Sequence, residues 1–142
     1  MGADRAVVVG LWKRPNREGF DQLRDILGAC DYQAQAVDVG GCLHLKSACS
    51  YIGNNSILIN RSLVDPEQFH GFELIDVADE EPAGANALLV KDIVIIPASF
   101  PKTRTLLERR GFCVRAIDMS ELQKAEGGVT CTSLIFNDEA MV

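Results

Sequence analysis

Positive charge is scarce in this sequence. Its 142 residues carry 14 lysines and arginines against 20 aspartates and glutamates, which gives a formal net charge of −6. Aromatic residues make up only 6 % of the chain, and neither a basic run nor an aromatic ladder is present. Because binding to a phosphate backbone depends on basic side chains that replace counterions, this composition argues against a nucleic-acid partner.

Long hydrophobic runs are also lacking. The opening "MGADRAVVVG" holds an apolar run of four residues, 6–9. A membrane-spanning helix needs about 20 such residues, and a secretory signal peptide needs a longer apolar core than this one. The opening therefore predicts a cytoplasmic protein with no membrane partner.

The cysteines follow no regular pattern. Cys30, Cys42, Cys49, Cys113 and Cys131 are odd in number and irregularly spaced. None forms a Cys-x-x-Cys pair, and none joins a histidine at the spacing of a zinc site, so no metal is expected. The pattern favours reduced thiols in the cytoplasm. Nothing in the sequence predicts a cofactor.

What the chain does contain is an alternation of strand and helix patterns. The apolar, β-branched run over 5–11 predicts a buried strand. A helix is expected over 15–29, where apolar residues recur at helical spacing. Gly53-Asn54 indicates a hairpin turn. The remaining predicted elements are strands over 32–39, 42–52, 55–60, 72–77, 112–119 and 129–136, two strands within 86–99, and helices over 101–111 and 120–126.

The order strand, helix, strand, strand pair recurs at a spacing of roughly 50 residues, within the range of repeat architectures. No low-complexity segment or linker interrupts it. The stretch 79–86 is the most loop-like, and we interpret it as a surface or active-site loop rather than a domain boundary. The sequence thus predicts a single α/β domain over residues 1–142.

Two residues of this pattern could carry chemistry. Cys131 lies in "EGGVTCTS" and His44 in "GGCLHLKS", each shortly after a Gly-Gly pair and each at the expected start of a strand. A cysteine nucleophile needs a base or acid beside it, and a histidine can serve as either. From spacing alone, a buried structural role is the commoner fate of such a cysteine, and both readings stay open.

Three stretches taken together resemble a known family. "VGLWKRPNREG", "GCLHLKSACS" and "MSELQKAEGGVTCTSLIFN" are similar, in order and spacing, to the dimethylarginine dimethylaminohydrolases of the guanidino-group-modifying (pentein) superfamily. The resemblance runs from about residue 5 to residue 137. It implies an α/β propeller of five strand-strand-helix-strand blades around a polar channel, and hydrolysis of methylarginine to citrulline and a methylamine. The chain corresponds to about half of that ring, its C-terminal half.

The resemblance also implies residue roles. Cys131 matches the nucleophile that attacks the guanidinium carbon, and His44 matches the acid/base that protonates the leaving amine and then activates water. Arg14 matches the arginine that holds the substrate's α-carboxylate, and Ala125 falls where the family uses a backbone carbonyl against the substrate's amine. Bidentate arginine is well suited to a carboxylate. Without the family, Arg14 reads as a solvated charge at a helix start.

Two local features bear on the implied site, one that agrees with the dimethylarginine dimethylaminohydrolases and one that departs from them. The histidine is followed by Leu45-Lys46, whereas deiminases and amidinotransferases tend to place an aspartate two positions after it. This favours methylarginine over arginine as the guanidino substrate. Pro15 stands where the family usually carries threonine, next to Arg14.

The acid that partners the family's histidine has no counterpart in this chain. Asp79, Glu80 and Glu81 are the clustered acids, but they are expected in a solvated loop. Two hypotheses follow: a guanidino hydrolase completed by a partner or a missing N-terminal half, or a catalytically inactive half-propeller that serves binding or assembly. Because half a ring leaves apolar blade faces open, a homodimer or higher closed oligomer is expected.

Overall fold

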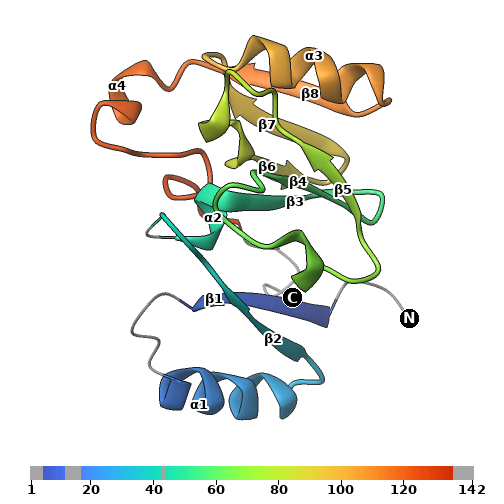
Figure 1. Cartoon of the computed structure of the whole chain (residues 1–142), viewed down its shortest axis with the longest axis vertical. Coiled ribbons are helices and arrows are strands. Elements are labelled where there is room, and N and C mark those ends of the chain that lie inside the picture. Colours follow the sequence, from blue (N-terminus) through green and yellow to red (C-terminus); the bar gives the residue numbers. More distant parts are fainter. Residues whose placement is uncertain (1–4, 12–16, 43, 136–142) are drawn as a thin grey trace, which may run out of the picture.

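The computed structural model describes residues 5–11, 17–42 and 44–135. Figure 1 shows the elements stacked from α1 at one end to α3 at the other, with three small sheets between them. Their bounds are β1 Ala6–Leu11, α1 Arg17–Gly28, β2 Gln33–Asp38, α2 Leu45–Ala48, β3 Cys49–Gly53, β4 Ser56–Ile59, η2 Pro66–Gln68, β5 Glu73–Asp76, η3 Pro82–Ala85, β6 Leu88–Val90, β7 Ile93–Pro97, α3 Pro101–Arg109, β8 Cys113–Ile117 and α4 Ser120–Gln123.

Each sheet is built from strands that follow one another in the chain. β1 and β2 pair in parallel across α1. In the second sheet β3 and β4 form an antiparallel hairpin and β4 then pairs with β5 in parallel. The third sheet repeats this order, with β6 and β7 antiparallel and β7 and β8 parallel across α3. The fold is therefore mixed α/β.

The strand β4 has side chains buried on both faces, which explains the three consecutive apolar residues 57–59 within it. Leu58 belongs to a core cluster shared with β7, β8 and α3, while Ile57 and Ile59 belong to a second cluster shared with β2 and with Phe69. The β3–β4 turn is made by Asn54 and Asn55, whose φ angles of 50° and 56° suit a tight two-residue hairpin. The predicted hairpin is confirmed.

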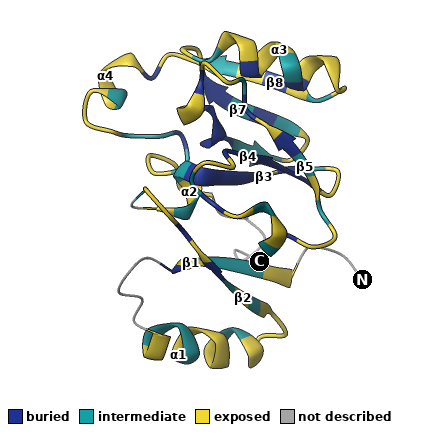
Figure 2. Ribbon diagram, in the orientation of Figure 1, coloured by how far each residue is buried: buried dark blue, intermediate teal, exposed yellow. Residues whose placement is uncertain are grey.

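Burial is uneven along the stack. Figure 2 shows buried residues concentrated in the two three-stranded sheets, whereas α1 is largely exposed. No residue of α1 is buried, and Ile26 on it is 64 % exposed. No helix among the described residues is long and apolar enough to cross a membrane.

One predicted strand is wrong in part, and another is wrong over all of its described residues. Residues 45–48, within the strand expected over 42–52, form the short helix α2, and the strand begins only at Cys49. The strand expected over 129–136 is a turn at 129–132, and 133–135 have no regular structure. A strand needs a neighbour to satisfy its backbone groups, and among the described residues none pairs with 133–135. Residue 136 lies outside the described residues.

Candidate active site

A pocket of about 490 Å³ lies where segments distant in the sequence meet. Figure 1 shows the chain returning after α4 to the neighbourhood of α2. His44 and Cys131 both line this pocket, so the structure brings the two candidate chemical groups into one site. The polar residues that line it with them are Ser47, Asn60, Ser62, Asn86, Gln123 and Glu126.

His44 is the residue that caps the N-terminus of α2, and its backbone is extended, with φ −133° and ψ 139°. Its carbonyl oxygen accepts the backbone N–H of Ser47 at 3.0 Å and the thiol of Cys42 at 3.3 Å. The side chain is exposed to solvent. The expectation of a strand position was wrong: His44 lies at the N-terminal cap of α2, and its imidazole makes no capping hydrogen bond to that helix.

Cys131 lies in a turn held by Gly128, whose carbonyl oxygen accepts the N–H of Cys131 at 3.1 Å and of Thr132 at 3.3 Å. The thiol is exposed. The turn follows α4 through Glu126, whose φ of 58° lies in the left-handed region that few residues other than glycine adopt. This bend lets the N–H of Gly127 reach the carbonyl oxygen of Leu122 at 2.9 Å.

The Gly-Gly pair before Cys131 is required by close contacts rather than by flexibility. A Cβ on Gly127 would come within 2.9 Å of the carbonyl oxygen of Leu122. A Cβ on Gly128 would come within 2.5 Å of the Asn86 side-chain nitrogen. Neither glycine has a positive φ. The chain therefore passes close against α4 and Asn86 just before it presents the thiol.

The structure supports the other predicted site residues less fully than it supports His44 and Cys131. Arg14 lies outside the described residues. Ala125 is exposed in the turn after α4, where its N–H donates to the carbonyl oxygen of Leu122 at 3.1 Å. Ala125 is not among the residues lining the pocket, although Glu126 next to it is. Lys46 is exposed on α2.

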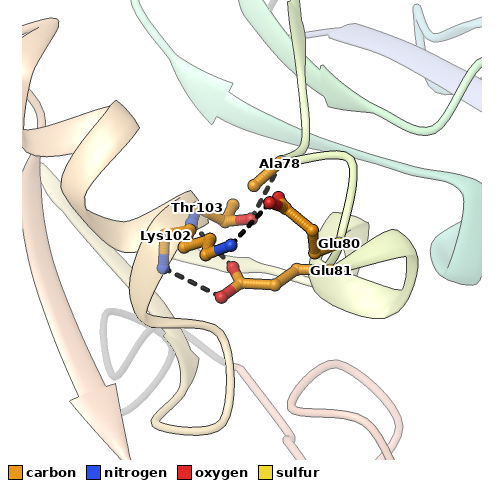
Figure 3. A network of polar contacts seen from close by, with 5 residues as sticks. All are labelled: Ala78, Glu80, Glu81, Lys102 and Thr103. Atoms are coloured by element: carbon orange, nitrogen blue, oxygen red, sulfur yellow. Dashed lines mark hydrogen bonds and ion pairs between the residues drawn. The ribbon is translucent and has the colours of Figure 1, made fainter.

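The acids of the 79–86 stretch have other partners (Figure 3). Glu81 is 7 % exposed, and its carboxylate accepts the N–H of Lys102 at 2.9 Å and of Thr103 at 2.7 Å. Glu80 forms an exposed ion pair with the ammonium of Lys102, and this hydrogen bond lowers the pKa of Glu80. The expected solvated loop is thus wrong for Glu81, which is buried because it caps α3.

Charged groups are few at the pocket. Among its described lining residues, Glu126 carries the one carboxylate. No cluster of three or more potential metal ligands occurs among the described residues.

Two other thiols near α2 are partly or fully shielded from solvent. Burial raises the pKa of Cys42, and burial together with the nearby Cys42 raises the pKa of Cys49 to about 12. Cys131, in contrast, is exposed and lines the pocket that His44 also lines.

No protein-family model matches the chain. Two curated proteins named N(G),N(G)-dimethylarginine dimethylaminohydrolase do match: the Pseudomonas aeruginosa protein is 36 % identical over 90 % of this chain, and the Streptomyces coelicolor protein 34 % identical over 90 %. The chain is a relative of the dimethylarginine dimethylaminohydrolases. It spans about half the length of these curated relatives, 50 % and 49 % respectively.

Solved structures agree with this relationship. A cysteine-to-serine mutant of the Pseudomonas aeruginosa dimethylarginine dimethylaminohydrolase, complexed with citrulline, superposes with a TM-score of 0.84 at 34 % identity, covering 96 % of this chain and 53 % of that one. An amidinotransferase from Microseira wollei superposes with a TM-score of 0.80 at 18 % identity, covering 92 % of this chain and 44 % of the other. The second match shows a shared fold alone.

Sequence reasoning missed the two asparagines of the pocket. Asn60 follows β4 directly and Asn86 precedes β6, and both are only 7 % exposed. Asn60 donates its side-chain N–H to the carbonyl oxygen of Pro82 at 2.9 Å, which ties the end of β4 to η3. A polar residue at the carboxyl end of a buried strand is the signal that could have found Asn60, since such strand ends commonly face sites in α/β folds. Asn86, which lies before β6, carries no such signal.

Proposed function

We propose that this chain carries the nucleophile and the acid/base of a dimethylarginine dimethylaminohydrolase-like hydrolase that acts on the guanidino carbon of methylated arginine. The observation that carries the proposal is that Cys131 and His44 line one pocket although 86 residues of chain separate them in sequence. A thiol and an imidazole that face the same pocket are the pair of groups that nucleophilic catalysis requires.

In the proposed reaction the Cys131 thiolate bonds to the guanidinium carbon, and the carbon–nitrogen bond to the methylated nitrogen breaks. His44 gives its proton to that nitrogen, which departs as a neutral amine. A water molecule then gives a proton to His44 and attacks the carbon, and the carbon–sulfur bond breaks to release citrulline. A guanidinium carbon is a weak electrophile, so both the thiolate and the proton donor are needed.

Substrate binding is proposed to use two further residues. Arg14 would bind the substrate's α-carboxylate through two parallel N–H donors, and the backbone carbonyl of Ala125 would accept the substrate's α-ammonium group. Lys46, in place of an acidic residue after His44, favours a methylated over an unmethylated guanidine. The exposed turn of Ala125, adjoining the pocket at Glu126, is compatible with this role.

We also propose that the sheets are blades of a propeller. The hairpin β3–β4 with β5, and the hairpin β6–β7 with β8, have the same order of antiparallel and parallel pairs. β1 and β2, joined across α1, would supply part of a third blade. In this arrangement the pocket faces the centre of the ring, as a channel site would.

The carboxylate that orients His44 is proposed to come from outside this sequence: from another copy of the chain, from a partner chain, or from the N-terminal half of a longer protein. Glu81 is committed to capping α3, and Glu126 is the one carboxylate among the described lining residues. Exposed apolar side chains support association: Leu134 is 86 % exposed and Ile135 58 %.

The experiment traps the covalent intermediate. A His-to-Gly variant of a dimethylarginine dimethylaminohydrolase has been captured as an adduct with S-methyl-L-thiocitrulline. We expect His44→Gly to accumulate the corresponding adduct on Cys131, with methanethiol released, because the base that activates water is gone. Intact-mass and peptide-mapping mass spectrometry measure it.

The control is the double variant with Cys131→Ser, which should carry no adduct, while His44→Gly with Cys113→Ser should carry the full amount. Equal modification of exposed Cys30 and Cys113, or no adduct at saturating reagent, would refute the proposed nucleophile.

A further inference from the structure

Thr130, the residue directly before the proposed nucleophile, has its hydroxyl oxygen 3.9 Å from the sulfur of Cys131. Either atom can donate when the sulfur is a thiol. Once the sulfur is a thiolate it can only accept, so the hydroxyl is then the donor. A hydrogen bond to the charged form stabilises that form.

The hydroxyl is held in place by Asn86. The side-chain N–H of Asn86 donates to the Thr130 hydroxyl oxygen at 3.0 Å, and the side-chain carbonyl of Asn86 accepts the backbone N–H of Thr130 at 3.1 Å. The Thr130 hydroxyl oxygen also lies 3.2 Å from the side-chain oxygen of Asn86. The hydroxyl proton of Thr130 can therefore point either to this amide oxygen or to the sulfur of Cys131. A thiolate, being charged, is the stronger acceptor of the two.

Asn86 is itself fixed from the core. It is 7 % exposed, and its chain neighbours Ala85 and Ala87 are 0 % and 2 % exposed. The N–H of Ala87 donates to the hydroxyl of Ser50 on β3 at 3.1 Å. The close approach of Gly128 to the same amide leaves it little room to turn. Asn86 thus joins a rigid part of the fold to the turn that carries the thiol.

We infer that Asn86 and Thr130 are positioning residues that act on Cys131: Asn86 fixes Thr130, and the Thr130 hydroxyl donates to the thiolate. The inference rests on Cys131 being the nucleophile of the proposed function. It assigns to the two residues a task besides holding the turn together, namely donating a hydrogen bond to the attacking thiolate and directing it into the pocket that His44 shares.

The test is the rate of iodoacetamide labelling of Cys131, followed by mass spectrometry against pH, with Cys113 of the same chain as internal reference. Thr130→Val keeps the shape of the side chain and removes the donor. In Thr130→Val we expect the curve of labelling rate against pH to shift to higher pH by about one unit. At neutral pH the rate then falls about threefold, because the thiolate fraction drops about tenfold while its intrinsic nucleophilicity rises.

Three variants separate this effect from damage to the turn. Thr130→Ser retains the hydroxyl and should restore the wild-type profile. Thr132→Val removes the other flanking hydroxyl, which donates to the carbonyl oxygen of Gly128 at 3.1 Å and not to the sulfur; its profile should stay unchanged. Asn86→Ala should shift the profile in the same direction as Thr130→Val, with Cys113 unaffected in each case.

The outcomes discriminate between the two proposals. A wild-type Cys131 that labels no faster than Cys113 would count against the proposed nucleophile. A reactive Cys131 whose profile is unmoved by Thr130→Val, or moved equally by Thr132→Val, would overturn the positioning role alone. Near-ultraviolet circular dichroism identifies any variant whose fold is lost; if Thr130→Val is such a variant, the labelling profile of folded Asn86→Ala decides, and an unmoved profile there overturns the positioning role.

Discussion

The carboxylate of Glu81 accepts the backbone N–H of Thr103 at 2.7 Å and so joins the loop after β5 to the first turn of α3. The same carboxylate accepts the N–H of Lys102, and in return the Thr103 hydroxyl accepts the N–H of Ala78 at 3.2 Å. Thr103 is fully buried. An acid that sequence reasoning treats as solvated therefore completes a helix terminus, where unpaired N–H groups would otherwise be left.

Glu81→Ala should lower the free energy of unfolding by about 2 to 3 kcal/mol, because two backbone donors lose a charged, buried acceptor. Urea denaturation followed by circular dichroism measures it. Glu80→Ala is the matched control: its ion pair with Lys102 is exposed, so the midpoint should scarcely move. Equal losses in both variants would show that the cap is not the source of the stability.

Gly128→Ala should destabilise the fold by about 1 to 3 kcal/mol, since the new Cβ would have to displace the Asn86 amide. Gly28→Ala, at the end of α1, is the opposite case because nothing lies within 4 Å of its added Cβ. That substitution should be neutral or add up to about 1 kcal/mol. Thermal unfolding of the pair measures the contrast, and a stable Gly128→Ala protein would mean that the turn can move away from Asn86.

Stability should fall as the solution is made alkaline, and Cys49 should account for part of the fall. Its pKa is raised to about 12 in the folded chain, chiefly by burial, whereas an exposed cysteine has a pKa near 8.5. Between these values the unfolded chain releases the proton and the folded chain keeps it, so the contribution is intact below about pH 8.5 and is lost as pH rises.

From pH 7.5 to 9.5 the loss attributable to Cys49 should be about 1 kcal/mol. Cys49→Ala should flatten the pH dependence by that amount, even if its stability at neutral pH is lower. Cys113→Ala, which removes an exposed thiol, should keep the wild-type slope. Parallel slopes for all three proteins in urea denaturation would contradict the assignment.

The chain should form a homodimer at micromolar concentration. α1 buries none of its residues within the chain, and Leu134, Ile135 and Ile26 are more than half exposed. Light scattering coupled to size exclusion should give about twice the chain mass of 15.5 kDa. Leu134→Asp should shift the mass toward the monomer, while Lys91→Asp, on the exposed β6–β7 turn, should not. A stable wild-type monomer would refute the association.

Sequence reasoning succeeded where the signal is local. The strand over 55–60 contains the apolar run 57–59, and the Gly53-Asn54 turn lies next to it. Both β4 and the hairpin could therefore be predicted from neighbouring residues alone. Residues 45–48 misled it because "CLHLKSA" alternates like a strand and a four-residue helix is too short to display its own period. The β-branched stretch after Gly128 misled it because pairing depends on a distant neighbour.

The same distinction between local signals and long-range contacts applies to the candidate site. Cys131 and His44 could be named from the sequence because the family resemblance marks them, and the structure brings both to one pocket. The roles of Glu81 and Asn86 could not be predicted from the sequence, because their hydrogen-bond partners lie 21 and 44 residues further along the chain, respectively. Those long-range contacts are fixed only once the sheets have packed. The role of Arg14 lies outside the described residues and stays a prediction.

Each three-stranded sheet is assembled from one continuous piece of chain, 49–76 for β3 to β5 and 88–117 for β6 to β8. Short loops therefore close first, and their closure costs little entropy, which favours fast and largely independent formation of each piece. The Cys131 turn is held by Asn86, which lies just before the second piece, and the N–H of the neighbouring Ala87 donates to the hydroxyl of Ser50 in the first piece. We therefore expect the turn that carries the thiol to become ordered only when the two pieces pack together, and to lose its order when they separate.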